Sequence, residues 1–198
     1  MEPGFSKHKN ILFIEDRINA EDIQQLQKHK RAKTVSLTRL KLDNLEFLIP
    51  LTNLENLKLY GCTIKDWTAL QDLKKMKDLF INGVKKENDN FSFLKQLIHL
   101  QELSIGYALH FNSFPDLSNS TNLKRLQLFN CKNLEDIQNV AHIPNLEKFG
   151  IVVTPQNPGN LEFIMQLPTI KYMSGAFGGK KIDEEFHALL AKYNIQYG

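Results

Sequence analysis

The stretch LTNLENLKLYGCTI, residues 51–64, spaces its apolar side chains in a way that excludes any single regular element. The steps between apolar residues are three, three, two, three and two, at Leu51, Leu54, Leu57, Leu59, Cys62 and Ile64. A helix repeats about every 3.6 residues and a strand every two, so neither runs through the whole stretch. The two-residue step predicts a short strand with alternate side chains inward. The three-residue steps predict helical or 3-10 turns, each turning one apolar residue inward.

The same change of period recurs along the chain. Each unit opens with a pair of apolar residues two apart, and successive units start 22, 22, 24, 23 and 23 residues after one another. The pairs are Val35 and Leu37, Leu57 and Leu59, Leu79 and Ile81, Leu103 and Ile105, Leu126 and Leu128, and Phe149 and Ile151. One such unit cannot bury its apolar side chains alone, so the core must be continuous between neighbouring units.

The repeats resemble the leucine-rich-repeat family, whose signature is L-x-x-L-x-L-x-x-N/C-x-L. LENLKLYGCTI (54–64) matches every fixed position, with Ile64 in place of the last leucine. LKRLQLFNCKNL (123–134) matches through Cys131. The resemblance covers residues 34–175 and is greatest to the short class, about 22 residues long, of bacterial internalins and eukaryotic intracellular leucine-rich proteins.

The resemblance implies an α/β solenoid, a right-handed horseshoe with a parallel concave sheet and a helical or 3-10 convex side. We expect a single domain over residues 1–198, with a strand and helix as the N-terminal cap (1–33), repeats over 34–175 and a helical C-terminal cap (176–198). Strands are predicted to start near residues 12, 35, 57, 79, 103, 126 and 149. In the caps, Ile23 and Leu26 are predicted to be buried on a helix, and Asp183 and Asn194 to be the N-cap and the stop of another.

The Cys or Asn position of the signature, which turns inward and bonds neighbouring coils in this family, carries no asparagine here. It is filled by Leu40, Cys62, Val84, Ala108, Cys131 and Thr154, and we expect looser turns on that side. The two cysteines are three coils apart, about 14 Å at the usual strand spacing. Because a disulfide needs Cα atoms within about 7 Å, both are predicted to be buried, reduced and structural.

Composition excludes several classes of partner. The net charge is +3, and the basic stretches KHKRAK (28–33) and GGKK (178–181) are scattered, so we expect solvated faces and no nucleic acid. No apolar run approaches the roughly 20 residues of a membrane span. The N-terminal stretch lacks the apolar core of a signal peptide. We therefore expect a cytoplasmic protein, with export by a route that needs no cleavable signal left open.

No constellation for catalysis is visible. None of the six histidines is spaced as a metal pair with another histidine or a cysteine, and His99 is predicted to be exposed on the convex side. SGAFGGKK (174–181) is not a phosphate-binding loop. We expect no enzyme activity, no cofactor and no metal.

The residues that flank the inward pairs face the concave side and give the candidate binding site. Large aromatics cluster there, at Tyr60, Phe80, Tyr107 and Phe129. Aromatic side chains are enriched at interface hot spots, although they could instead pack on one another and brace the sheet. Charged residues of the same face change sign along the array, which would orient a partner: Asp78, Glu102, Arg125 and Lys148, with Lys58 between Leu57 and Leu59.

These features predict a non-catalytic module, monomeric when unbound, that binds another protein through the concave face. A bacterial immunity protein that masks a cognate toxin is one role that suits such a module, by analogy with other small standalone domains. A secreted effector that acts on host proteins, or a structural scaffold subunit, are the alternatives.

Overall fold

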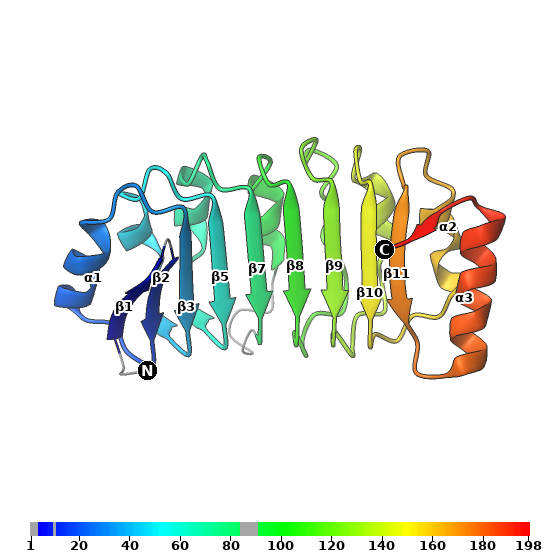
Figure 1. Cartoon of the computed structure of the whole chain (residues 1–198), viewed down its shortest axis with the longest axis horizontal. Coiled ribbons are helices and arrows are strands. Elements are labelled where there is room, and N and C mark those ends of the chain that lie inside the picture. Colours follow the sequence, from blue (N-terminus) through cyan, green and yellow to red (C-terminus); the bar gives the residue numbers. More distant parts are fainter. Residues whose placement is uncertain (1–3, 10, 84–90) are drawn as a thin grey trace.

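A single ten-stranded sheet runs along the length of the molecule (Figure 1). The structure, a computed structural model, describes residues 4–9, 11–83 and 91–198. The strands follow the order β1-β2-β3-β5-β7-β8-β9-β10-β11-β12, and β1 pairs antiparallel with β2 while the other neighbours in this order pair parallel. Their bounds are Gly4–His8 (β1), Ile11–Glu15 (β2), Thr34–Thr38 (β3), Asn56–Tyr60 (β5), Asp78–Asn82 (β7), Glu102–Gly106 (β8), Arg125–Phe129 (β9), Lys148–Val152 (β10), Tyr172–Ala176 (β11) and Gln196–Tyr197 (β12).

The predicted strand register is confirmed. The seven predicted strands begin one residue before the expected positions, and the inward pairs lie opposite one another from Val35 and Leu57 to Leu126 and Phe149. Leu57 and Leu59 are 0% and 2% exposed, so the alternate residues of each strand do face the core. Strands β1, β11 and β12 were not predicted.

Short helices cover the other face of the sheet, behind it in Figure 1. They are the 3-10 helices η1 (Glu46–Leu48), η2 (Thr68–Asp72), η4 (Phe91–Gln96), η5 (Gln138–His142) and η6 (Gly159–Leu161), with the single-turn α2 (Glu162–Met165). Two short strands, β4 (Lys41–Leu42) and β6 (Thr63–Ile64), pair between two turns. Each helix buries one or two apolar residues, among them Leu70, Leu94 and Val140, against the sheet. This arrangement confirms the predicted α/β solenoid, and we keep the name concave face for the side of the sheet turned away from these helices.

The two cysteines are buried and form no disulfide, as predicted. The thiols of Cys62 and Cys131 donate to the carbonyls of Leu37 and Ile105 in the preceding coils, at 3.4 and 3.6 Å. Burial raises the pKa of Cys131 to about 11, which keeps its thiol neutral. Val84, expected at the equivalent position, lies outside the described residues. Weak thiol hydrogen bonds therefore join coils at two of the positions where the family signature allows asparagine.

The N-terminal edge of the sheet is covered by α1 (Ala20–Gln27), which buries Leu26 as predicted and leaves Ile23 half-buried. Asn19 and Asp22 form a reciprocal capping box, and the Asp22 carboxylate also accepts the backbone N–H of Phe5 at 2.9 Å. This bond ties up an outward N–H of the edge strand β1, which an exposed edge would offer to another chain. Gly4 adopts φ +106°, and an added Cβ there would approach Asp22 Oδ1 within 2.8 Å. This contact could not be predicted from the sequence, because it joins an edge strand to a helix residue 17 positions later.

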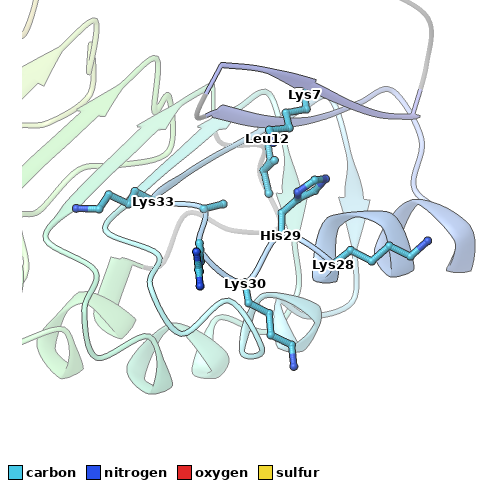
Figure 2. Close-up of a pocket in the computed structure, with 8 residues that line it drawn as sticks. Lys7, Leu12, Lys28, His29, Lys30 and Lys33 are labelled. Carbon is cyan, nitrogen blue, oxygen red and sulfur yellow. The ribbon is translucent and has the colours of Figure 1, made fainter.

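A hollow of about 520 Å³ lies where α1 ends (Figure 2). Lys7 of β1, Leu12 of β2 and the segment 28–33 line it. The ring of His29 points toward Lys7 and Leu12, whereas the side chains of Lys28, Lys30 and Lys33 extend away from it (Figure 2).

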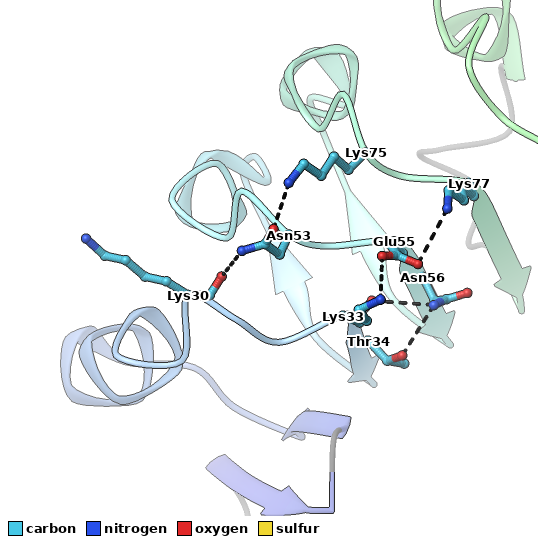
Figure 3. Close-up of polar contacts among 8 residues, drawn as sticks. All are labelled: Lys30, Lys33, Thr34, Asn53, Glu55, Asn56, Lys75 and Lys77. Carbon is cyan, nitrogen blue, oxygen red and sulfur yellow. Dashed lines mark hydrogen bonds and ion pairs between the residues drawn. The ribbon is translucent and has the colours of Figure 1, made fainter.

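Asparagines do join neighbouring coils, although at a column that was not predicted. The side chain of Asn53 donates to the carbonyl of Lys30 at 3.1 Å (Figure 3), and Asn122 and Asn145 donate likewise to Ile98 and Thr121, at 3.2 and 2.8 Å. These residues precede the last inward leucine before each strand, on the opposite side of the solenoid from the cysteines. The N-L dipeptide in TNLENL, TNLKRL and PNLEKF was the available signal.

His99 occupies the same column and corrects another expectation. It was predicted to be exposed, but it is half-buried, and its Nε2 is buried with no hydrogen-bond partner. Burial, with a smaller effect from Lys74, lowers the pKa of His99. The side chains of this column lie between neighbouring coils, so His99 is partly covered even though it does not point into the core.

A ladder of alternating charge runs beside the asparagines, one residue before each strand. Glu55 accepts Lys33 and Lys77 at 2.8 and 3.7 Å (Figure 3), and Glu147 accepts Lys124 and Lys171 at 3.2 and 2.9 Å. The paired lysines lower the pKa of both glutamates. Gln101 occupies this column between Lys77 and Lys124, so the two lysines are not direct neighbours.

The C-terminal cap is α3 (Lys180–Lys192), which buries Phe186 and Leu190. The predicted N-cap was wrong: the helix is capped by Gly179, and Asp183 lies in the first turn, where its carboxylate accepts the N–H of Phe177 at 2.9 Å. An aspartate at either place relieves unpaired N–H groups, which is why the pattern alone misplaced the start. Asn194, the predicted stop, follows the helix with φ +56°, in agreement with a left-handed C-terminal residue.

Candidate protein-binding surface

The four predicted aromatic residues of the concave face form one connected cluster. Tyr60 of β5 and Phe80 of β7 have ring centroids 5.2 Å apart, and Phe80 and Phe129 of β9 lie 5.9 Å apart. Tyr107, which follows β8, meets Phe129 edge to face at 6.1 Å. These separations lie in the range of favourable aromatic pairs. The structure thus brings together residues from four successive coils.

The cluster is partly open to solvent. Tyr107 is 52% exposed, and Tyr60, Phe80 and Phe129 are half-buried. Phe129 reaches across β8 to meet Phe80, because β8 lies between β7 and β9 in the sheet. The aromatic rings therefore form a continuous apolar strip across four neighbouring strands of the sheet, β5, β7, β8 and β9.

A shallow pocket of about 250 Å³ adjoins the cluster near the start of the same strands. It is lined by Lys58, Asp78, Phe80, Glu102 and Ser104, with Asn56, Leu57 and Leu79. Asp78 lies directly opposite Glu102 in the register of β7 and β8. Burial first, and the charge of Glu102 second, raise the pKa of Asp78. The acidic pair gives this part of the face a negative potential that Lys58 only partly offsets.

The opposite sign follows on the next strands. Arg125 of β9 lies 3.9 Å from the Glu102 carboxylate, and Lys148 of β10 places its ammonium over the ring of Tyr172, 4.8 Å from the centroid. The predicted order of signs along the array is thus present on one face, with acidic groups on β7 and β8 and basic groups on β9 and β10. No part of this arrangement identifies a ligand by itself.

A column of left-handed residues forms the rim of the concave face at the carboxyl ends of the strands. The residues of this column all adopt φ between 52° and 75°; they are Asp16, Arg39, Gly61, Gly83, Tyr107, Asn130 and Val153. Asp16 and Arg39 hold each other in a two-bond ion pair, which includes Nη2 to Oδ2 at 2.8 Å. Val153 is unusual because a β-branched side chain rarely adopts positive φ, and it is 45% exposed.

Other kinds of site are sparse in the part of the chain that the structure describes. Over residues 4–9, 11–83 and 91–198, no three His, Cys, Asp or Glu side chains gather closely enough to hold a metal ion. None of the helices in those ranges has the length and apolar character needed to cross a bilayer.

Internalins are among the solved structures with the same architecture. An internalin C2 of Listeria monocytogenes is 21% identical, with a TM-score of 0.54, and the match covers 78% of this chain and 63% of that one. An internalin F of the same organism is 13% identical, with a TM-score of 0.53, and the match covers 93% of this chain and 65% of that one. The chain therefore spans less than two thirds of each internalin structure.

No family model and no curated protein matches the amino-acid sequence. At this level of identity, likeness to a solved structure concerns the fold and carries nothing about partners. The likeness to the two internalin structures, together with the parallel sheet, the confirmed register and the 3-10 helices on the convex side, shows that this chain has the leucine-rich-repeat fold.

Proposed function

We propose that the chain is a non-catalytic module that binds another protein through the concave face. One observation supports this most: Tyr60, Phe80, Phe129 and Tyr107 form a connected and partly exposed aromatic strip on the open face of a rigid sheet. Exposed apolar patches carry a solubility cost unless a partner covers them, and aromatic anchors supply much of the energy of protein interfaces.

The charged residues beside the strip would fix the orientation of a bound partner. Asp78, Glu102, Arg125 and Lys148 form one row across β7 to β10, acidic on the first two strands and basic on the next two, so a partner with the opposite order of charges would dock in one orientation. The charged groups are half-exposed or exposed, and their contribution is to orientation and association rate more than to affinity.

The competing explanation is that the aromatic rings only brace the sheet. Ring pairs of this geometry contribute about 0.5–1.5 kcal/mol each beyond their buried area. Bracing predicts that removing a ring lowers the melting temperature, whereas binding predicts that it lowers affinity. The two readings are therefore separable by measuring both quantities on the same variants.

The experiment begins with capture of partners from native lysate by the full chain, identified by mass spectrometry. Calorimetric titration then compares the wild type with Phe80→Ala and Phe129→Ala. Each should weaken binding at least roughly tenfold, which corresponds to about 1.4 kcal/mol. Phe93→Ala is the matched control, because Phe93 is also a half-buried phenylalanine but stacks on Trp67 at 4.2 Å on the convex side. Retained affinity with a large fall in melting temperature for the concave variants would leave bracing as their only role.

A narrower role within this function is masking of a cognate toxin by a bacterial immunity protein. It rests on analogy with small standalone domains that bind one partner. An adjacent toxin gene, and loss of protection in the Phe80→Ala strain, would support it. A partner from a host cell would instead favour an exported effector, and a constant subunit of a larger assembly would favour a scaffold.

A further inference from the structure

The hollow at the N-terminal cap is lined mainly by cationic residues. Of its eight lining residues, five are cationic, Lys7, Lys28, Lys30, Arg31 and Lys33, and the others are His29, Leu12 and Ala32. No carboxylate lines it. Three other pockets among the described residues each contain a carboxylate, Asp116 in one, Glu147 in another and Asp78 with Glu102 in the third.

Most of this positive charge is not neutralised. Lys33 is paired with Glu55 at 2.8 Å, and Lys28 reaches Gln25 at 3.3 Å. Lys7, Lys30 and Arg31 form no ion pair with any residue that the structure describes. The C-terminal end of α1 leads into the same segment and offsets part of the positive potential, so attraction of an anion must come from the side chains.

The backbone that carries these cations is fixed at several points. The side chain of Asn53 donates to the carbonyl of Lys30 at 3.1 Å (Figure 3), and the N–H of Ala32 donates to the backbone carbonyl of His29 at 2.8 Å. The ring of His29 stacks on Phe5, with centroids 5.8 Å apart and planes 15° apart. The cationic side chains of segment 28–33 are exposed, as expected from the sequence, and its backbone forms an anchored loop beside a concavity.

We propose that this hollow binds a compact anion that carries two or more phosphate groups. Several lysines and one arginine around a single concavity suit a multivalent anion better than a single phosphate, because each added charge meets another cation. A volume of about 520 Å³ also exceeds what one phosphate would fill. Half-buried Ala32 supplies an apolar contact for the remainder of such a ligand.

The side chains of Lys28, Lys30 and Lys33 extend away from the hollow in Figure 2 and must turn inward to contact the anion. Ordering these long side chains costs conformational entropy, so affinity should be modest, and it should fall as salt is added. The hollow lies at the N-terminal end of the sheet, away from the aromatic strip, and the proposal does not depend on the concave face binding a protein.

The test titrates the full chain with inorganic pyrophosphate at low ionic strength and follows backbone amides by NMR. We expect saturable shifts confined to residues 28–33 and the flanking parts of β1 and β2, with orthophosphate binding more weakly. The double variant Lys30→Ala, Arg31→Ala should weaken pyrophosphate binding at least roughly tenfold. Both side chains are exposed, so the fold should persist, and a thermal melt checks this.

The matched control is Lys132→Ala, Lys181→Ala, which removes the same charge from exposed sites elsewhere. It should leave pyrophosphate affinity nearly unchanged. Absence of saturable shifts, or an equal loss of affinity in both double variants, would overturn the proposal, because either result means that only general electrostatic attraction operates. Phosphatidylcholine vesicles with and without phosphatidylinositol bisphosphate identify the source: sedimentation with the phosphorylated lipid, lost in the hollow variant, assigns a lipid headgroup, and pyrophosphate binding without sedimentation assigns a soluble phosphate compound.

Discussion

The ring of Phe129 lies directly over Gly106, its partner in the register of β8 and β9. A Cβ added at Gly106 would come within 2.0 Å of Phe129 Cε2, which no side chain can tolerate. Because Gly106 has no side chain, Phe129 can reach across β8 to Phe80. A glycine in a strand often marks such a close approach.

This relationship gives the first prediction, a coupling between the two positions. Gly106→Ala must displace the Phe129 ring and should cost about 1 kcal/mol of stability through the lost ring contacts. In a Phe129→Ala background the same change should be neutral or stabilising, because alanine restricts the unfolded chain more than glycine does. Urea melts of the double-mutant cycle measure the difference. If Gly106→Ala has the same effect on stability in both backgrounds, contact between position 106 and the Phe129 ring contributes nothing to that effect.

The second prediction concerns the core of the solenoid. Leu126→Ala should destabilise the chain by about 2–5 kcal/mol, because the fully buried side chain is shared by two neighbouring coils. Lys95→Ala on the exposed side of η4 should change stability by less than about 0.5 kcal/mol. Equal effects in urea melts would show that the inside and outside positions are misassigned.

The third prediction tests backbone strain at the rim. Val153 adopts φ 53°, whereas Gly61 and Gly83 occupy the same column with φ 59° and 75°. Val153→Gly should stabilise the chain by about 0.5–1 kcal/mol, since relief of the left-handed strain exceeds the entropy gained by the unfolded chain. Val152→Gly, one residue earlier in β10, should destabilise it. A lower melting temperature for Val153→Gly than for the wild type would contradict the strain.

The fourth prediction is a pH dependence from His99. Its pKa is lowered below the ordinary 6.5 by burial, so the unfolded chain binds the proton more tightly than the folded one. Stability should therefore fall as the pH drops from about 6.5 through the lower folded pKa. His99→Asn should remove this dependence and should raise stability by about 1 kcal/mol, because asparagines at the same column bond the preceding coil. Denaturant melts at pH 7.5 and 5.5 would reveal it, and an unchanged slope in the variant would count against it.

The fifth prediction concerns Glu147, held between Lys124 and Lys171. Hydrogen bonds to these lysines lower its pKa below the ordinary 4.5, so its contribution to stability is present above that value and is lost as the pH falls through the folded pKa. Glu147→Gln should flatten the acid limb of the stability curve. Because the pair is partly exposed, added salt should reduce the difference between variant and wild type. Glu135→Gln, an exposed glutamate without an ion pair among the described residues, is the control.

The sequence by itself determined the solenoid. Apolar residues whose spacing alternates between two and three can only be buried together if a strand and a turn alternate in each coil, and neighbouring coils share the core. That constraint is local and repeats in the chain, so the inward pairs, the strand register and the aromatic residues of the concave face could all be predicted from it. Buried cysteines and the stop at Asn194 followed from the same local reasoning.

Only the tertiary structure decided how side chains from different coils meet. Phe129 covers Gly106, Asp22 closes the edge strand at Phe5, and the segment 28–33 encloses a hollow with Lys7, although no periodicity links the members of these sets. The start of α3 at Gly179 and the half-buried place of His99 were misjudged for the same reason. A repeat fixes which face a residue takes within its own coil, whereas contacts across coils and at the caps depend on the stacking of side chains of different lengths, which the spacing of apolar residues does not encode.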